Sequence, residues 1–319
     1  MKTQLTLLFI LISLSFSTIL NVDGEEYTTI QSAIDDAETG DTVLVHQGLY
    51  YENLDINKTI TLTSLAMYDN LDTWYDYESL TAQYEINNDN ILNTIIDASQ
   101  ATDENFTSGI VVRSPEDECI APVIMGFTIR GGMGTMVTEE IETPDGILEV
   151  ERKIGGGLFS YLTNADIHHN QFSNNGDPSV ENGGALYSQT SQEDWGFGDR
   201  SSERQRCEIS EINIHDNFYR DNDANFGNSF SNRTFTDVIN MSNSIFDVAN
   251  CQEDQISPVW VYIESEAETD IAGSVSNTCA ITLSDVYIDS DIDQECMDDS
   301  CGSESNPFKT IFFCPLITK

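Results

Sequence analysis

The stretch Gly155-Gly-Gly-Leu-Phe-Ser160 is repeated further along the chain as Gly183-Gly-Ala-Leu-Tyr-Ser188. Phe218-Tyr-Arg-Asp-Asn222 and Phe246-Asp-Val-Ala-Asn250 are separated by the same interval, and Phe172-Ser-Asn-Asn175 belongs to the same set. Repeats of about 20–45 residues with Gly and Asn at the turns are typical of stacked coils. A single coil is too thin to bury its own apolar side, so the repeats predict a solenoid whose coils pack on their neighbours.

Short apolar segments bounded by Gly, Asn and Asp run along the rest of the chain and are typical of strands. One amphipathic helix is expected near the start, because Ile30, Ala33 and Ile34 share one face with Ala37 and the Gly40-Asp41 pair ends it. No comparable helix recurs between the strands, which excludes alternating βαβ units and predicts an all-β fold. The expected strands are Thr42–His46, Thr59–Thr63, Thr94–Ile96, Gly109–Val112, Val123–Ile129, Leu158–Tyr161, Ala185–Tyr187, Ile209–Ile214, Val238–Met241, Val259–Ile263 and Ala280–Ile288.

The charge of the chain is strongly negative. Among 319 residues there are 55 Asp and Glu against 13 Lys and Arg, which gives a formal net charge of −42. Nucleic acids and anionic membranes are recognised by basic surfaces, so this composition argues against both as partners. Because 39% of the residues are hydrophobic and the acidic residues are spread along the chain, we expect an acidic, solvated surface around a real core.

The N-terminus has the features of a secretory signal peptide, which we place at residues 1–24. Lys2 precedes an apolar stretch, and small residues suited to a signal peptidase stand at Ser15 and Ser17 or at Val22 and Gly24. An uncleaved N-terminal anchor is the alternative. No second apolar run is long enough to span a bilayer. We therefore expect a mature chain without a transmembrane span, either secreted or associated with the cell surface in the extracellular space or cell envelope.

The cysteines agree with export into an oxidising compartment, although their number leaves one unpaired. The chain has no Cys-x-x-Cys pair, and its four histidines show no ligand spacing with the cysteines, so the sequence does not predict a zinc site. His168, His169 and His215 stand beside Asn170 and Asn217, which predicts turn or stacking positions for them and not catalysis. The seven cysteines are Cys119, Cys207, Cys251, Cys279, Cys296, Cys301 and Cys314.

Several segments resemble the pectin-lyase superfamily. Residues 27–37 followed by 40–53 are similar to its capping helix and first coil, and Asn93–Asp97 and Gly126–Gly132 are similar to later coils. The Gly183–Leu186 and Phe172–Asn175 segments also resemble repeats of polymorphic outer-membrane proteins. The resemblance implies a single-stranded right-handed parallel β-helix with an N-terminal capping helix, which we place at residues 25–295.

The C-terminal residues 296–319 form a separate tail in this interpretation. Cys301-Gly-Ser-Glu-Ser-Asn-Pro-Phe-Lys-Thr-Ile311 resembles the opening of another β-helix domain, which predicts the start of a second, truncated one. The alternative is a disulfide-tethered segment that caps the last coil.

The catalytic sets of the superfamily are incomplete in this chain. Gly48-Leu-Tyr-Tyr-Glu52 fits a motif of pectin methylesterases, but their other segments are missing, as are those of polygalacturonases. We interpret this stretch as a turn in which Tyr50 packs inward and Glu52 stays in water. The preferred function is therefore an acidic, non-catalytic β-helix whose loops bind a polysaccharide or cell-surface glycan. The alternative is a polysaccharide lyase or glycoside hydrolase acting on acidic, pectin-like glycans, with Arg200 or Arg204 as the base.

Two insertions carry the candidate binding residues. In residues 192–206 aromatic rings could stack on sugars beside charged groups, and in residues 65–85 aromatic residues cluster. The alternative in both cases is a loop whose rings pack on the protein itself. The candidates are Asp194, Trp195, Phe197, Asp199, Trp74, Tyr75 and Tyr77.

Alternating carboxylates and amides predict two segments as calcium ligands, because Ca²⁺ prefers oxygen. The first is Asp221, Asp223 and Asn225, and the second is Asp289, Asp291 and Asp293. Neither is an EF-hand, since the sixth position lacks Gly and the twelfth lacks Glu. Chance alternation in such an acidic chain is the other interpretation.

Overall fold

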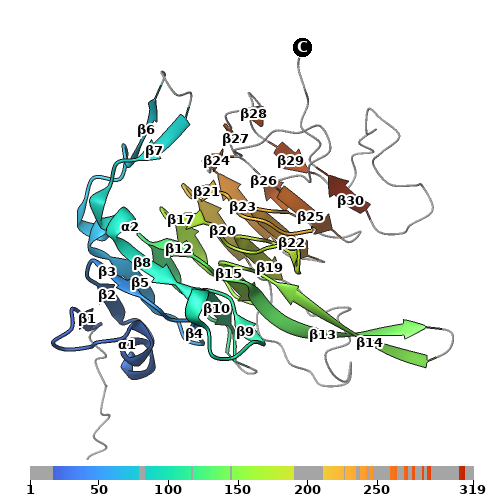
Figure 1. Ribbon diagram of the computed structural model, residues 1–319, viewed down its shortest axis with the longest axis horizontal. Helices are drawn as coiled ribbons and strands as arrows, with labels where there is room; N and C mark the ends of the chain where they lie inside the picture. The colour runs from blue at the N-terminus through green and yellow to red at the C-terminus, as the bar shows by residue number, and fades with distance from the viewer. Residues whose placement is uncertain are drawn as a thin grey trace, which may run out of the picture.

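The computed structural model describes most of the N-terminal two thirds of the chain and short segments beyond it (Figure 1). All structural statements below concern these residues. The described ranges are 17–78, 83–115, 118–143, 146–189, 211–225, 227–234, 238–242, 245–247, 259–263, 269–271, 275–276, 282–283, 286–288 and 309–312.

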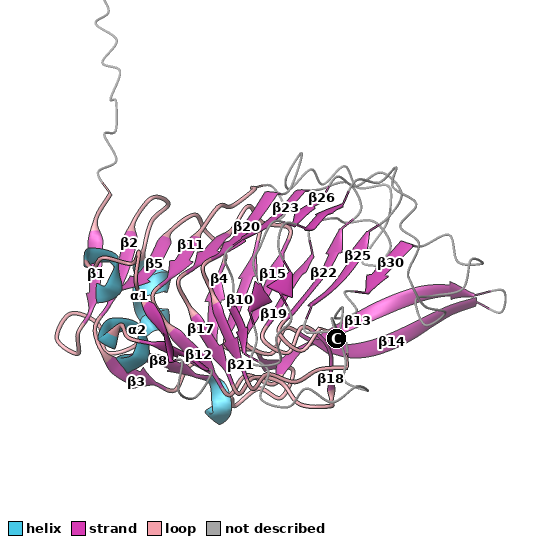
Figure 2. Ribbon diagram, turned by 90° about the horizontal axis from the view of Figure 1, so that it is seen from above, coloured by secondary structure: helices cyan, strands magenta, loops and turns pink. Residues whose placement is uncertain are grey.

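Three sheets, built mainly from parallel strands, form the body of the molecule (Figures 1 and 2). Sheet A consists of β1 (Ile19–Val22), β2 (Thr42–Val45), β5 (Thr61–Ser64), β11 (Val123–Met125), β16 (Asp166–His168), β20 (Glu211–His215), β23 (Val238–Ser242), β26 (Thr269–Ile271) and an antiparallel β29 (Val286–Ile288). Sheet B consists of β3 (Gly48–Tyr50), β8 (Thr94–Asp97), β12 (Thr128–Arg130), β17 (Gln171–Ser173), β21 (Phe218–Arg220) and β24 (Ile245–Asp247). Sheet C consists of β4 (Leu54–Ile56), β10 (Ile110–Arg113), β15 (Leu158–Tyr161), β19 (Leu186–Gln189), β22 (Phe230–Thr234), β25 (Val259–Ile263) and an antiparallel β30 (Lys309–Phe312).

The chain visits the three sheets in a fixed order. From β2 in sheet A it passes to β3 in sheet B and β4 in sheet C, and then returns to sheet A at β5, which pairs with β2. The same order recurs from β8 through β10 to β11 and continues to β26. We call one such passage a coil. The prediction of an all-β fold with few helices is confirmed.

The core fills the space between the sheets, because side chains alternate between the two faces of each strand. In sheet A the inward row is apolar and continuous from coil to coil, with Leu62 opposite Ile124, then Ile167 and Ile214. In sheet B, Phe172 lies opposite Tyr219 with their rings stacked at 5.3 Å. Each such buried side chain contributes about 1.5–3 kcal/mol by leaving water.

The glycine repeat marks a corner where coils approach closely. Gly155 and Gly183 have φ values of 62° and 67°, a left-handed conformation in which a side chain is strained. A Cβ added to the next residue, Gly156, would lie 2.1 Å from the backbone oxygen of Gly184. The interval expected from the sequence is confirmed here, since Leu158 pairs with Leu186.

The second repeat has a different register from the expected one. Tyr219, and not Phe218, pairs with Phe246, so the two segments are shifted by a single position from the alignment that the sequence suggested. The reason is that Phe218 and Tyr219 are adjacent on a strand and point to opposite faces. Both are fully buried, Tyr219 in the core between the sheets and Phe218 against the excursion that precedes β8.

Helix α1 (Ile30–Asp36) covers the first coil, as expected for a capping helix (Figure 2). Ile30, Ala33 and Ile34 are buried against the core. The carboxylate of Glu52 accepts hydrogen bonds from the backbone N–H groups of Ile30 (2.8 Å) and Gln31 (2.9 Å). Glu52 is thus half-buried, and beyond the expected contact with water its carboxylate satisfies unpaired donors at the helix N-terminus.

Strand β1 lies within the range predicted as a signal peptide. It pairs with β2 from Ile19 to Val22, and Leu20 and Val22 are buried. The backbone N–H of Thr18 donates to Asp41 Oδ1 at 2.7 Å. A chain that began after Gly24 would lack the first strand of sheet A, whereas one that began after Ser17 would keep it.

Within the described ranges, two excursions leave the coils. The first, between β5 and β8, contains a 3-10 helix (Leu65–Tyr68), a hairpin of β6 (Tyr75–Glu78) and β7 (Gln83–Ile86), and α2 (Asp89–Asn93). The second is a long hairpin of β13 (Gly134–Thr143) and β14 (Gly146–Ile154) that stands out from the stack (Figures 1 and 2). The hairpin was not predicted, since its charged alternating strands carry no coil repeat. The remaining short elements are a 3-10 helix (Ala98–Gln100), β9 (Phe106–Thr107), β18 (Val180–Asn182), β27 (Val275–Ser276) and β28 (Thr282–Leu283).

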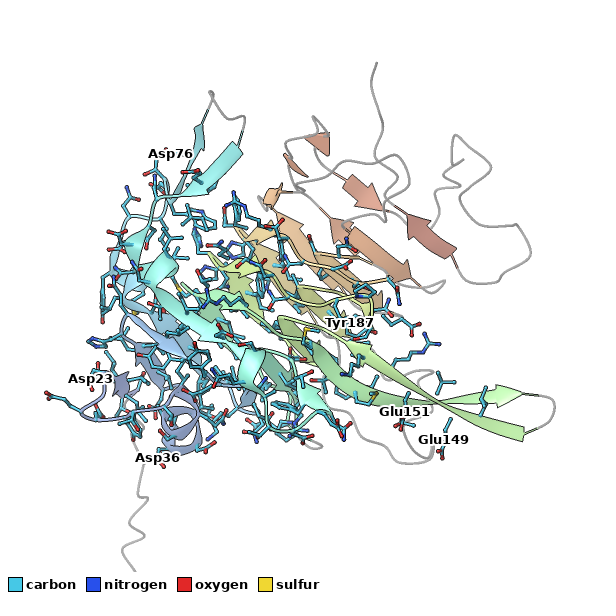
Figure 3. All side chains as sticks on the ribbon, viewed as in Figure 1. Asp23, Asp36, Asp76, Glu149, Glu151 and Tyr187 are labelled. Carbon is cyan, nitrogen blue, oxygen red and sulfur yellow. The ribbon has the colours of Figure 1, made fainter. Side chains whose placement is uncertain are left out.

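Acidic side chains lie at the periphery of the stack. Asp23, Asp36, Asp76, Glu149 and Glu151 are exposed around it, while Tyr187 is buried (Figure 3). Within the described ranges, no helix has the length and apolar character needed to cross a membrane.

Candidate functional site

His168 and His169, which are adjacent in sequence, meet the distant His215 on the outer surface of sheet A. His168 ends β16 and His215 ends β20, and the register of these two strands places them directly opposite each other. Ile167 and Ile214 point into the core. His168 and His215, which directly follow them on the same strands, therefore point outward. The two imidazole rings are stacked with centroids 4.7 Å apart and planes 6° apart.

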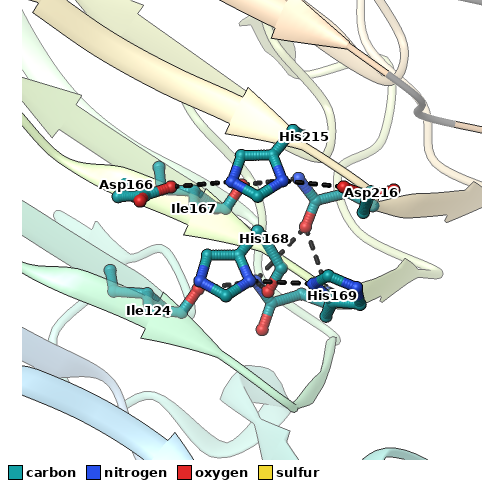
Figure 4. A network of polar contacts seen from close by, with 9 residues as sticks. Ile124, Asp166, Ile167, His168, His169, His215 and Asp216 are labelled. Carbon is teal, nitrogen blue, oxygen red and sulfur yellow. Dashed lines mark hydrogen bonds and ion pairs between the residues drawn. The ribbon is translucent and has the colours of Figure 1, made fainter. Parts of the chain in front are cut away.

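The third histidine is positioned by a tight corner. His169 has a φ of 52°, and Asp216, at the equivalent place in the next coil, has a φ of 50°. Asn170 and Asn217 follow them and are fully buried. The side-chain Nδ2 of Asn170 donates to the backbone oxygen of Ile124 (2.9 Å), and that of Asn217 donates to the backbone oxygen of Ile167 (2.8 Å) (Figure 4).

The stacked, buried side chains of Asn170 and Asn217, which we call the asparagine ladder, hold this corner in place from the interior. Each buried amide satisfies backbone groups of the coil before it, and Asn170 Nδ2 also contacts Asn217 Oδ1 at 3.2 Å. Buried polar groups that are fully bonded hold their surroundings in one arrangement. The residues just before each asparagine are therefore held in register, which is why His168, His169, His215 and Asp216 occupy fixed places.

The polar contacts of the cluster connect all five side chains in two groups (Figure 4). His168 Nδ1 lies 2.8 Å from His169 Nδ1, so one of the two nitrogens donates and the other accepts. His215 lies between two carboxylates, with its Nε2 3.1 Å from Asp166 Oδ1 and its Nδ1 2.8 Å from Asp216 Oδ2. All five side chains are half-buried, which leaves the cluster open to solvent.

The residues of the cluster differ in their charge at neutral pH. Hydrogen bonds to Asp166 and Asp216 raise the pKa of His215 to about 9, so it is a cation at neutral pH. Burial lowers the pKa of His168 to about 4 and also lowers the pKa of His169, so both are neutral. The pKa of Asp166 is lowered by its hydrogen bond to His215 and by the nearby histidines, against the effect of burial. Perturbed pKa values that diverge within one cluster are typical of functional sites.

Trp74 borders the cluster on the side of the first excursion. Its ring lies 5.5 Å from that of His169 and 5.4 Å from that of Tyr75. Trp74 is only 2% exposed and packs with Ala66, Ile91 and Phe218. The prediction that it stacks on a sugar is therefore corrected, because the ring has no free face; the excursion packs its own aromatic residue against the coils.

The other predicted site residues are distributed as follows. Tyr75 is half-buried beside Trp74, and Tyr77 is placed only as part of the backbone of β6. The candidates of the second insertion and of the second calcium segment lie outside the described residues; they are Asp194, Trp195, Phe197, Asp199, Arg200, Arg204, Asp289, Asp291 and Asp293.

The first calcium segment lies at the turn after β21. The backbone N–H groups of Asp223 and Asn225 donate to the backbone oxygens of Asn175 (2.9 Å) and Val180 (2.9 Å), and Asp221 is exposed. Calcium at this turn remains a prediction. Within the described ranges, three or more His, Cys, Asp or Glu side chains with metal-ligand spacing meet only at His168, His169 and His215, whose ligand atoms all lie within 4.8 Å of one another.

The sequence contained a signal for this cluster that the glycine repeat did not reveal. Ile167-His-His-Asn170 matches Ile214-His-Asp-Asn217, and this interval is longer than that from Gly155 to Gly183 because the insertion before β20 lengthens the coil. Alignment on the asparagines would have placed His168 on His215. A search for histidines at metal-ligand spacing from the cysteines could not find this cluster, because its histidines come from neighbouring strands of one sheet.

Comparisons with known proteins show no family for this chain and a weak structural similarity. No protein-family model matches this chain, and no curated protein matches it. Among solved structures, the chain is similar to a crystal structure of a pectin methylesterase mutant in complex with a hexasaccharide, with 12% sequence identity, a TM-score of 0.26, and coverage of 73% of this chain and 80% of that one.

Proposed function

We propose that this protein is an exported, single-stranded right-handed parallel β-helix that binds a polysaccharide or cell-surface glycan on the outer face of sheet A. The repeated order of the three sheets, the capping helix and the asparagine ladders support the β-helix. The disulfide bond of Cys119 and the apolar N-terminal stretch support export.

The observation that carries the proposal is the polar patch on this face. Along sheet A the outward row changes from Thr63 and Met125 to His168 and His215, and the neighbouring row places Asp166 opposite Asn213. Planar imidazole, carboxylate and amide groups at fixed spacing offer donors and acceptors to the hydroxyl groups of a sugar. Because the coils are rigid, such groups need no ordering when a ligand binds.

Both insertions of the chain are next to strands of this sheet in the sequence. The excursion with β6 and β7 leaves from the end of β5, on the side of sheet B. In the sequence, the insertion with residues 192–206 lies between β19 of sheet C and β20 of sheet A. Insertions on a rigid scaffold are where binding residues concentrate. The first excursion thus borders the sheet A face, since the ring of Trp74 lies beside that of His169.

The same face supports binding without turnover. Strands β5, β11, β16 and β20 contain no Lys or Arg that could act as the cationic base of a lyase. A chain with a net charge of −42 also repels a free polyuronate. A neutral glycan, or one whose charge is offset by cations, suits this surface better.

A glycan array with the purified, chelator-treated chain tests the proposal, followed by incubation of the bound glycans and analysis for cleavage products. We expect binding without products, weakened at least tenfold by Asn213→Ala and unchanged by Leu49→Ala on the outer face of sheet B. Formation of unsaturated or hydrolysed products would favour the lyase or hydrolase. Equal binding by both variants would place the ligand elsewhere.

A further inference from the structure

We propose that His168, His169 and His215 bind one divalent transition metal ion of the zinc class, with Asp216 as the fourth ligand. The inference goes beyond glycan binding, since the ion needs no sugar. It concerns the one place in the described chain where three such side chains meet.

The geometry requires only small movements of the side chains. In a tetrahedral site with Zn–N bonds of 2.0–2.1 Å, ligand nitrogens lie about 3.3 Å apart. The nitrogens of the three histidines lie within 4.8 Å of one another, and the closest pair, Nδ1 of His168 and Nδ1 of His169, is 2.8 Å apart. Rotation of the imidazole rings about their side-chain bonds would bring the nitrogens to this spacing without a change in the register of the strands.

The orientation of the rings favours one side of the stack. His168 turns its Nδ1 toward His169, and His215 turns its Nδ1 toward Asp216 (Figure 4). An ion placed between them would take the position of the proton shared by His168 and His169 and of the proton that joins His215 to Asp216. Each ring bound through Nδ1 would then carry its remaining proton on Nε2.

An outer carboxylate is already in place. Histidines that bind metals usually donate the other ring N–H to a carboxylate, which orients the ring. The Nε2 of His215 lies 3.1 Å from Asp166 Oδ1, on the side away from Asp216. Asp166 would keep this contact when the ion occupies Nδ1, so the ring of His215 would not have to leave its strand.

The donor set selects the class of ion. Three imidazoles and one carboxylate suit Zn²⁺, Co²⁺, Ni²⁺ or Cu²⁺, whereas Ca²⁺ and Mg²⁺ require oxygen ligands. The half-buried cluster is open to solvent, and the negative field of the chain raises the local concentration of cations.

A purely structural role in the stack would explain the positions of His168 and His215 but not that of His169. Stacking on the asparagine ladder accounts for the parallel rings of His168 and His215. His169 lies outside that row, because Asp216 occupies its place in the next coil. Its ring nevertheless adds a third nitrogen to the cluster, and the ligand nitrogens of the three histidines lie within 4.8 Å of one another.

The test uses the full chain without an affinity tag, dialysed against a chelator under non-reducing conditions with free thiols alkylated. Competition with a chromophoric chelator measures Zn²⁺ binding, and Co²⁺ provides a visible spectrum. We expect one ion per chain and dissociation constants at least tenfold higher for His168→Gln, His169→Asn and His215→Gln. Asp216→Asn should weaken binding severalfold. His46→Asn, at the fourth histidine, is the matched control and should change nothing.

Two results would overturn the inference: wild type that binds neither Zn²⁺ nor Co²⁺, or cluster variants that bind as wild type does. Asn tolerates the positive φ of positions 169 and 216, so these two variants should fold. X-ray absorption of the zinc-loaded wild type is independent of any variant and should show three imidazole nitrogens and one oxygen. A thiolate shell or an all-oxygen shell would contradict the site. A failure of glycan binding leaves these results unaffected.

Discussion

The imidazole of His168 lies parallel to that of His215, with ring centroids 4.7 Å apart, although the two residues belong to different coils and are far apart in the chain. This contact is a consequence of the stack: each residue is followed two positions later by a buried asparagine that bonds to the preceding coil. The histidine cluster on the surface and the asparagine ladder in the interior therefore belong to the same corner of the stack.

Replacement of Asn170 by Ala should destabilise the protein by about 2–4 kcal/mol. Asn170 is fully buried, and its amide bonds to the backbone of Ile124, Phe127 and His168 would be lost. Urea denaturation followed by circular dichroism measures the change. Asn174→Gly is the control, because Asn174 is exposed and Gly keeps its positive φ of 55°. Equal stability of Asn170→Ala and wild type would contradict a ladder that holds the coils.

Removal of the Glu52 carboxylate should destabilise the N-terminal end of the stack. In Glu52→Ala the backbone N–H groups of Ile30 and Gln31 lose their acceptors, at a cost of about 1–2 kcal/mol. Hydrogen exchange should become faster in α1 and β2 than in wild type. Glu25→Ala, at an exposed acidic residue, should have no such effect. Unchanged protection of α1 would show that Glu52 does not cap it.

Signal-peptide cleavage, if it occurs, should follow Ser17. The new N-terminus at Thr18 would then place its ammonium group beside Asp41, whose carboxylate accepts the Thr18 N–H at 2.7 Å. A cut after Gly24 would remove β1 and expose the edge of β2. Mass spectrometry of the exported protein decides between them: a chain starting at Thr18 is expected, and one starting at Glu25 would be inconsistent with β1 as part of the mature fold.

The stability of the metal-free protein should depend on His215 above neutral pH. Its pKa is about 9 when folded, against 6.5 as the ordinary value, so the folded state holds the extra proton between these values. The stabilisation is complete below pH 6.5 and is lost as the pH rises through 9, by on the order of 1 kcal/mol after screening by solvent. The difference in unfolding free energy between wild type and His215→Gln should therefore shrink from pH 6.5 to 9. A constant difference would contradict the ion pairs.

His168 should affect the stability of the protein at acidic pH. Its pKa of about 4 in the folded state means that the unfolded chain binds a proton first as the pH falls below 6.5. Unfolding should therefore become easier between pH 6.5 and 4, and His168→Gln should reduce this loss. Histidine titration by NMR in the folded protein gives the two pKa values directly; similar values for His168 and His215 would refute the division of charge.

The sequence predicted the parts of the structure that repeat. Leu158 and Leu186, the glycines before them, and the helix at Ile30 all follow from local pattern, and the structure has them where expected. The register of Phe218 was missed because two adjacent aromatic residues are both buried, one on each face of the strand. Pattern alone cannot decide which of them faces the core.

The site was less predictable than the fold. The burial of Trp74 depends on contacts with Phe218, which belongs to a coil far along the chain. The histidine cluster depends on the register of β16 and β20 across an insertion, so the interval of the glycine repeat does not reveal it. Both are properties of stacking, which only the three-dimensional arrangement fixes.

The most direct test of the account is a crystal structure of the zinc-soaked protein with anomalous diffraction recorded on both sides of the zinc absorption edge. We expect one strong peak between the Nδ1 atoms of His168, His169 and His215, with β16 and β20 in the register described above. A peak at another site with none here, or rings of His168 and His215 that do not face each other, would contradict it.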